Sequence, residues 1–203
     1  MKIRLLLAFA LLASIAQIFA QDKSKIKFGK ITPEDFKQTV YSLDSNANAI
    51  VIADIGSTEI VGNNKGGFSL EFKKFKRAHI LNKNGYDIAD VEISIYTDGD
   101  REEELVTLKA VTYNLENGKV VESKLETKSA VFKDRINKKL VVKKFTFPNI
   151  KEGSIIEYEY KLNSDFIFNL QPWDFQGEFP CLWSEYKVSL PEFYYYVTLT
   201  QGY

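Results

Sequence analysis

Residues 145–191 have the sequence FTFPNIKEGSIIEYEYKLNSDFIFNLQPWDFQGEFPCLWSEYKVSLP, which contains both tryptophans of the chain. Pro148 and Gly153 frame a tight connection, because proline fixes its own φ and glycine accepts φ values that are closed to other residues. Apolar and charged side chains then alternate over residues 154–162, and a period of two predicts a β-strand with one buried side. We expect the buried side to carry Ile156, Tyr158, Tyr160 and Leu162, and the solvent side Glu157, Glu159 and Lys161.

Strand-like segments separated by Gly, Asn and Asp also fill the rest of the sequence after Ala49. The strongest hairpin signal is Asn117-Gly118, because this dipeptide accepts the positive φ angles of a tight turn. A second turn is expected at residues 62–67, and a change of phase at Lys73-Lys74 suggests a bulge or a bend. The pattern predicts a mostly β fold, as an antiparallel two-sheet sandwich or a strongly curled sheet of about eight to ten strands.

One short N-terminal helix is predicted before this β region. Thr32 can serve as the N-cap, Pro33 as the first helical residue, and the acidic residues that follow suit the positive end of the helix dipole. Phe36, Val40 and Leu43 follow at helical spacing, so we expect a helix over residues 33–43 with one docked face. A turn cluster at residues 44–48 is expected to end it.

The first twenty residues have the pattern of a secretory signal. Lys2 and Arg4 precede an uncharged apolar stretch over residues 5–19, which is shorter than the ~20 residues of a membrane-spanning helix. We expect cleavage between Ala20 and Gln21, and no membrane span afterwards. The chain would then divide into a signal peptide (1–20), a leader with the short helix (21–48) and a single β-sandwich-like domain (49–203), exported to the periplasm or cell surface of a Gram-negative bacterium.

The charge of the chain gives no sign of a nucleic-acid partner. Lys and Arg number 27 and Asp and Glu also 27, whereas nucleic-acid binders usually carry a basic excess or stripe. The lysine-rich runs 73–77 and 138–144 are interpreted as solvated strand faces or protected sheet edges. With one cysteine, no intramolecular disulfide is available, so an apolar core must stabilise the domain.

No residue pattern indicates a catalytic, metal or cofactor site. Cys181 and His79 are the single thiol and the single imidazole, so any Cys–His mechanism would need this pair. The apolar neighbours of Cys181 favour an inert buried thiol. His79 is expected to be a solvent-facing or hydrogen-bonded strand residue. The acidic run 98–104 lacks the ligand spacing of a calcium loop and is interpreted as a turn.

A cluster of aromatic residues near the C-terminus has two interpretations. These residues can close one end of the sandwich or pack against another domain, which we favour, or they can form a surface for a sugar or an extended peptide. The cluster comprises Phe166, Phe168, Trp173, Phe175, Phe179, Trp183 and Tyr186. The candidate packing or ligand surface consists of Trp173, Phe175, Trp183 and Tyr186.

The same region resembles a known family. The motifs Phe145-Thr-Phe-Pro148, Gly153-Ser-Ile-Ile-Glu-Tyr158, Trp173, Phe175-Gln176 and Trp183-Ser-Glu-Tyr186 are similar to those of domain of unknown function 3857. This domain precedes the transglutaminase-like domain of secreted Bacteroidetes-type proteins, and the likeness extends from about Ala49 to the C-terminus. The resemblance implies an accessory β-domain without a catalytic set of its own. It also implies that a transglutaminase-like domain would follow beyond Tyr203, so we expect the chain to be a fragment or a truncated relative.

From these features we expect a non-catalytic, exported accessory domain. It would pack against a transglutaminase-like domain of peptidase or acyl-transfer type, or present substrate to it, in cis or in trans. The alternative is a stand-alone module of the cell envelope that binds a peptide or a glycan through the region of Trp173 and Trp183.

Overall fold

The computed structural model describes residues 26–194, together with residues 197 and 199. The expected signal peptide, its cleavage site at Ala20 and Gln21, and most of the strand expected over 194–200 lie outside the described residues. The chain divides into two compact units, Met1–Lys30 and Ile31–Tyr203. The described part of the first unit contains a turn in which Lys30 N donates to Lys27 O at 3.1 Å. All elements below belong to the second unit.

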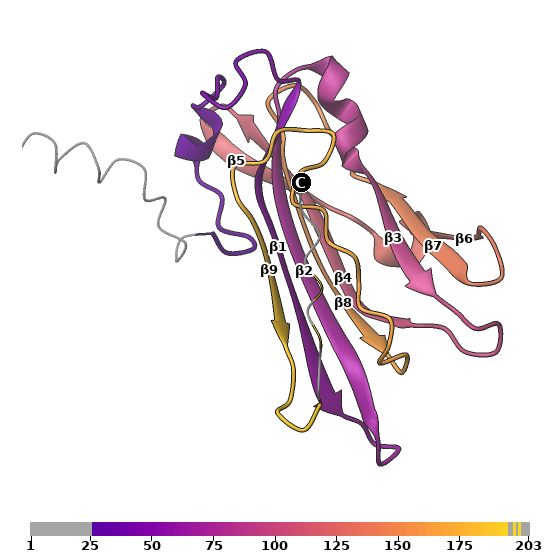
Figure 1. The fold of residues 1–203 in the computed structure, drawn as a ribbon. Coiled ribbons are helices and arrows are strands. Elements are labelled where there is room, and N and C mark those ends of the chain that lie inside the picture. The colour runs from indigo at the N-terminus through magenta and orange to yellow at the C-terminus, as the bar shows by residue number, and fades with distance from the viewer. Residues whose placement is uncertain (1–25, 195–196, 198, 200–203) are drawn as a thin grey trace, which may run out of the picture. The chain divides into compact units, whose positions relative to one another are not determined.

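Two β-sheets make up the second unit (Figure 1). Its described part contains a six-stranded sheet of order β5-β4-β8-β2-β1-β9 and a three-stranded sheet of order β3-β7-β6. The predicted mostly β class with two sheets is therefore confirmed. The strands are β1 (Ala49–Gly62), β2 (Phe68–Ile80), β3 (Asp90–Tyr96), β4 (Glu104–Glu116), β5 (Lys119–Lys124), β6 (Phe132–Arg135), β7 (Leu140–Thr146), β8 (Ile155–Ser164) and β9 (Ser184–Ser189). The short helices are η3 (Pro33–Phe36), η4 (Lys83–Ala89) and α2 (Thr127–Ala130).

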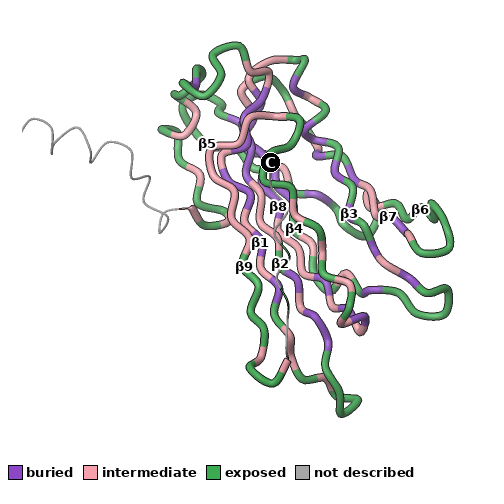
Figure 2. The backbone as a smooth tube through the Cα atoms, in the orientation of Figure 1, coloured by how far each residue is buried: buried purple, intermediate pink, exposed green. Residues whose placement is uncertain are grey.

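The hydrophobic core combines side chains from both sheets. Figure 2 shows buried segments along the strands of each sheet, with exposed turns at their ends. The core confirms the burial of Ile156, Tyr158 and Leu162, which the period of two in β8 predicts; Tyr160 is only partly buried. The large sheet contributes Val51, Phe72, Ala78, Ile156 and Leu162, and the small sheet contributes Val91, Ile93, Ile95, Val141 and Phe145.

Both predicted turns are confirmed. Asn117 and Gly118 join β4 to β5 with φ values of 50° and 76°, the positive values that this dipeptide accepts readily. Residues 63–67 join β1 to β2, where Asn63 N donates to Gly67 O at 2.9 Å. Local turn chemistry therefore sets the register of both hairpins.

One strand pair departs from the predicted antiparallel arrangement. β9 pairs with β1 in parallel, from Asp54↔Ser184 to Glu59↔Ser189. A hairpin turn can join only antiparallel strands, whereas a longer connection can return the chain to the starting end of the sheet. Residues 165–183 make such a connection between β8 and β9, so the alternation within each strand could not reveal this pairing.

The predicted helix is much shorter than expected. It ends at Phe36 as a single 3-10 turn, with Thr32 N and Oγ1 donating to Asp35 Oδ2 at 2.7 and 2.8 Å. Val40 and Leu43 are 64% and 55% exposed, so the expected docked face is wrong. Tyr41 is buried instead. A helix of this length has little stability of its own, so the tertiary contact of Tyr41 decides the path of the chain.

The bulge lies in β1 rather than at Lys73-Lys74. The β1–β2 register shifts between Val51 and Ala53, while β2 continues without interruption past both lysines. The uninterrupted alternation of β2 puts Lys74 and Lys76 in the same row as Phe72 and Ala78, which belong to the core. These two lysines therefore face the space between the sheets, contrary to the expected solvated face.

Candidate functional site

A buried ion-pair group lies where the core-facing row of β2 meets β1. In the register of the two strands, Asp54 is opposite Lys76 and Gly56 is opposite Lys74. The bulge before Ala53 shifts the phase of β1 by one residue and so turns Asp54 toward the other sheet. Asp54 is 8% exposed; its Oδ1 lies 3.1 Å from Lys74 Nζ and its Oδ2 lies 3.9 Å from Lys76 Nζ.

These three charged residues form the floor of a cleft of about 350 Å³ between the two sheets. One wall comes from η4 and β3, with Ile88 and Val91, and another from the segment 172–181. Exposed carboxylates surround the mouth of the cleft, and they belong to Asp87, Asp90, Glu92, Asp174 and Glu178.

Burial sets the protonation of the groups in the cleft. It lowers the pKa of the Lys76 ammonium, while the charge of Asp54 acts in the opposite direction. It raises the pKa of Tyr158 and that of the Cys181 thiol, so both are neutral at pH 7. The side chains at the floor are thus two lysines and one aspartate, beside a neutral phenol and a neutral thiol.

Trp173 and Tyr186, two residues of the predicted aromatic surface, are held by packing contacts beside this cleft. The Trp173 ring stacks on Tyr186 with a centroid distance of 5.1 Å and an interplanar angle of 8°, and Lys74 Nζ lies 4.3 Å from its centroid. Trp173 Nε1 donates to Ser184 Oγ at 3.1 Å. The Tyr186 hydroxyl is 2.6 Å from Thr58 Oγ1. Both rings thus fasten the segment 172–186 to the face of the large sheet.

The other two residues of that surface are more accessible. Phe175 lines the cleft and is 57% exposed, and Trp183 is half-buried next to β9. The structure therefore places Phe175 where it can contact a ligand and commits Trp173 to packing.

The single thiol and the single imidazole lie on opposite faces of the large sheet. Cys181 pairs with Val51, lines the cleft, and donates from Sγ to Trp183 O at 3.3 Å. His79 follows core-facing Ala78 and so points to the outer face, where its Nδ1 is 3.0 Å from the Tyr41 hydroxyl. The two side chains are therefore separated by the sheet. Of the two alternatives expected for His79, solvent-facing or hydrogen-bonded, the structure shows the hydrogen-bonded one.

Among residues 26–194, no group of three or more His, Cys, Asp and Glu side chains is arranged to hold a metal ion. The carboxylate of Asp98 in the acidic turn instead accepts from the backbone of Asp100 and from the Arg101 side chain, at 3.1 and 2.6 Å.

Glu157 is a buried residue that the sequence pattern assigned incorrectly to the solvent side. It lies opposite Arg77 in the register of β2 and β8 and forms an ion pair with it. Its Oε2 also accepts a hydrogen bond from the Tyr113 hydroxyl at 3.1 Å. The pattern fails because β8 is a central strand of the six-stranded sheet, and at Glu157 its outer face is buried as well as its core-facing side. Its cross-strand partner, Arg77, was not evident from the sequence.

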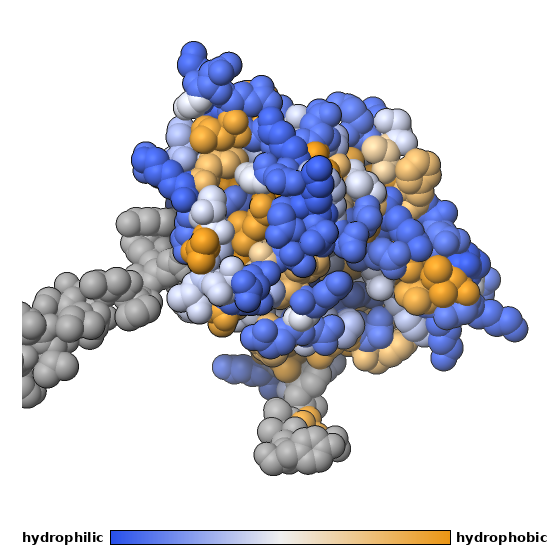
Figure 3. Space-filling view, turned by 90° about the horizontal axis from the view of Figure 1, so that it is seen from above, coloured by the Kyte–Doolittle hydropathy of each residue, from blue (hydrophilic) through white to orange (hydrophobic). Residues whose placement is uncertain are grey.

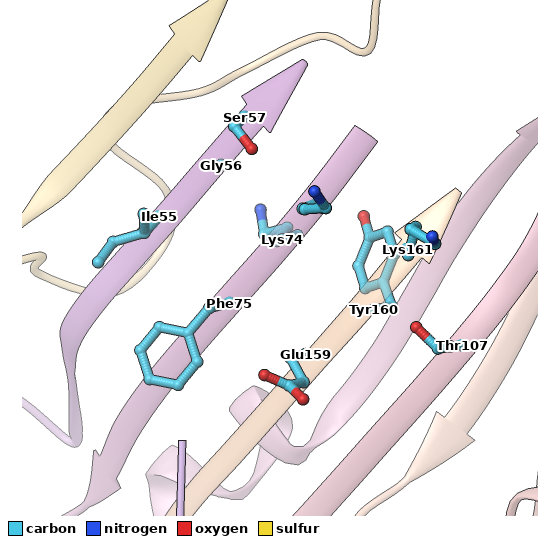
Figure 4. A pocket seen from close by; sticks show the side chains of 10 residues that line it. Ile55, Gly56, Ser57, Lys74, Phe75, Thr107, Glu159, Tyr160 and Lys161 are labelled. Atoms are coloured by element: carbon cyan, nitrogen blue, oxygen red, sulfur yellow. The ribbon is translucent and has the colours of Figure 1, made fainter. Parts of the chain in front are cut away.

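A second depression, of about 430 Å³, lies on the outer face of the large sheet. Figure 4 shows Ile55, Phe75 and Glu159 among its lining side chains, which come from β1, β2, β4 and β8. Among its charged lining residues, Lys161 and Lys73 pair with the neighbouring Glu71 at 3.0 and 2.7 Å, and Glu159 pairs with the neighbouring Lys109 at 2.8 Å. The cleft between the sheets, where Lys74 and Lys76 lie largely buried beside Asp54, is the stronger candidate for a functional site.

Burial of His79 predicts a pH dependence of stability. Burial lowers its pKa in the folded state from the ordinary value of 6.5, and a backbone hydrogen bond with Gly153 opposes this effect only in part. The unfolded chain therefore binds a proton more readily below about pH 6.5, and stability falls as the pH falls through that value. We expect the wild type to lose stability between pH 7 and pH 5 with a steeper slope than His79→Gln, measured by urea unfolding. Equal slopes would contradict this prediction.

Comparison with known proteins places the chain in a family. Residues 69–202 match the family described as a domain of unknown function with solved structure, DUF3857. No curated protein matches the chain. Among solved structures, the chain is similar to a candidate protease from Parabacteroides distasonis ATCC 8503, with 13% identity and a TM-score of 0.43. The match covers 58% of this chain and 23% of that one, so this chain spans under a quarter of the length of that protein. Because the family match covers more than half of its length, the chain belongs to the DUF3857 family.

Proposed function

We propose that this DUF3857 chain is a non-catalytic interaction domain. It packs against a transglutaminase-like domain of peptidase or acyl-transfer type, or presents substrate to it, in cis or in trans. The observation that carries the proposal is the cleft between the sheets, where charged and aromatic groups suited to binding surround a neutral, partly buried thiol. The imidazole that such a thiol would need lies on the opposite face of the sheet.

The nature of the partner rests on the family motifs. They lie in β7, at the start of β8, and in the segment 172–186, where they build the walls and the support of the cleft. Such a scaffold suits a domain that orients a partner, because a rigid support fixes the position of the contact groups.

Export belongs to the same proposal. The signal-like segment supports secretion to the periplasm or the cell surface, where the partner domain of the related proteins also resides. Within the described residues, no helix has the length and apolar character needed to cross a bilayer.

A second candidate function is a stand-alone peptide- or glycan-binding module, which the exposure of Phe175 at the cleft favours. On the face seen in Figure 3, most hydrophobic side chains form small groups separated by hydrophilic surface. Under this second function, Phe175→Ala would weaken ligand binding by the isolated domain, whereas under the first it would weaken binding of the partner domain.

An activity assay tests the absence of catalysis directly. The purified chain from residue 21 onward, and its Cys181→Ala variant, are incubated with peptide substrates and with acyl donor and amine pairs. We expect neither protein to turn over substrate above background. Turnover by the wild type that disappears in Cys181→Ala would overturn the proposal.

A binding assay tests the partner. A transglutaminase-like domain from the same organism, expressed separately, is titrated with the chain in calorimetry. We expect a complex that Phe175→Ala weakens and that Phe132→Ala, a change at an exposed aromatic residue of β6 outside the cleft, leaves intact. If the chain forms no complex with any transglutaminase-like domain, the proposed partner is wrong.

A further inference from the structure

The ammonium group of Lys76 is incompletely paired in the floor of the cleft. Its side chain is only 27% exposed, and Asp54, at 3.9 Å, is the one carboxylate within ion-pair distance among the residues that the structure describes. Lys74 is closer to the same carboxylate, at 3.1 Å, and also lies over the Trp173 ring. Asp54 therefore neutralises Lys74 better than Lys76.

In the part of the chain that the structure describes, no second carboxylate lies within ion-pair distance of Lys76. Tyr158 and Cys181 are neutral, and the acidic residues of the cleft lie at its exposed mouth. Asp90 there already accepts a hydrogen bond from Thr146 Oγ1, and Glu92 pairs with Lys144 at 2.9 Å. A partly buried charge that lacks a close partner is unfavourable, so an incoming anion would stabilise the floor.

We propose that the floor of the cleft binds a single carboxylate of a peptide, with Lys76 as its principal ion-pair partner and Lys74 as its second. This inference rests on the proposed function, because it specifies which group of a presented substrate the domain would hold. The volume of about 350 Å³ lies within the range of small-ligand sites and suits a few residues of peptide.

The mouth of the cleft determines what can carry this carboxylate. Its ring of exposed carboxylates repels phosphate, sulfate and acidic peptides, and attracts a peptide whose remaining side chains are basic. Phe175 and Phe179 line the same cleft and offer apolar contact to the peptide chain. The arrangement therefore selects one carboxylate on an otherwise neutral or cationic peptide.

The test uses a short basic peptide with and without its carboxylate. Acetyl-Lys-Ala-Ala with a free C-terminus, its C-terminal amide, and acetyl-Lys-Asp-Ala-amide are titrated separately into the chain at low salt. Binding is followed through the two tryptophan indole N–H signals in NMR spectra. We expect the free acid to bind at least tenfold more tightly than the first amide and to shift the Trp173 signal. The peptide with an internal Asp shows whether a side-chain carboxylate serves as well as a terminal one.

Two lysine variants make the test specific. Lys76→Met keeps an unbranched apolar chain that is one atom shorter and removes the charge, and we expect it to lower the affinity for the free acid at least tenfold. Lys109→Met removes a lysine on the outer face, paired with Glu159, and is expected to leave the affinity unchanged. Thermal unfolding of each variant shows that it is folded.

Equal binding of the acid and both amides, an unchanged affinity in folded Lys76→Met, or equally tight binding of inorganic phosphate would overturn the inference. The peptide assay contains no partner domain, so its outcome is separate from that of the proposed function. Loss of peptide binding with an intact partner complex would reject only the carboxylate site. Peptide binding without any partner complex would reject the proposed function instead.

Discussion

Replacement of Glu157 by alanine is expected to lower the free energy of unfolding by about 3–5 kcal/mol. Glu157 is fully buried on the outer face of β8, where it forms an ion pair with Arg77 and accepts the Tyr113 hydroxyl. Removing the carboxylate leaves the Arg77 guanidinium, which is also buried, without its carboxylate partner across the strands. The cost arises mainly from the loss of this buried ion pair and of the acceptor for Tyr113, so it should appear in urea unfolding at pH 7.

Glu159 provides a matched control on the same face of the same strand. It pairs with Lys109 at 2.8 Å, but the Lys109 and Glu159 side chains are 64% and 36% exposed, so water screens this pair. Exposed ion pairs contribute roughly 0–1 kcal/mol, so Glu159→Ala should be nearly neutral. If Glu157→Ala and Glu159→Ala lower the free energy of unfolding equally, the buried ion pair stabilises the fold no more than the exposed one. In the double variant Arg77→Met with Glu157→Leu, which removes both charges, stability should recover in large part.

Gly56→Ala is expected to destabilise the domain by about 1–3 kcal/mol and to displace Trp173. A Cβ at position 56 would lie 2.3 Å from an atom of the Trp173 ring, well inside contact distance. The ring would have to leave its stack on Tyr186 and its hydrogen bond to Ser184. The segment 172–186 would then lose its main attachment, and acrylamide should quench the fluorescence of Trp173 more strongly.

Gly62 is the control for this substitution, because it lies in the same strand and a Cβ there has no atom within 4 Å. Gly62→Ala should change stability by less than about 0.5 kcal/mol and leave the fluorescence unchanged. A second check combines Gly56→Ala with Trp173→Ala. If the steric clash is the cause, the double variant should be less destabilised than the sum of the two single changes. Strict additivity would point to another cause.

Local patterns were sufficient for several parts of the fold. The alternation over residues 154–162 identified the core-facing row of β8, and Asn117-Gly118 located the β4–β5 hairpin, because both signals depend only on neighbouring residues. Composition alone limited the catalytic possibilities, because Cys181 is the single thiol and His79 the single imidazole. These patterns could not predict that Glu157 and His79 are buried on the outer face of the large sheet.

The candidate site depended on contacts between distant segments. Lys74 and Lys76 belong to a run that looks solvated, and Asp54 lies within an apolar stretch; the β1 bulge brings them onto one face. The sequence identified Trp173, Phe175 and Tyr186 as members of one aromatic group. Only the path of residues 165–183 across the sheet shows that Trp173 and Tyr186 stack on each other whereas Phe175 is exposed.

The amino-acid sequence by itself determined the class of the fold, its tight turns and the residues available for chemistry, because side-chain period and turn propensity act over a few neighbouring residues. The tertiary structure alone decided the parallel addition of β9, the burial of Glu157 with Arg77, and the charged cleft around Asp54 and Lys76. Those features depend on strand register and on which remote segment covers each face, and a shift of one residue in register exchanges buried and exposed side chains.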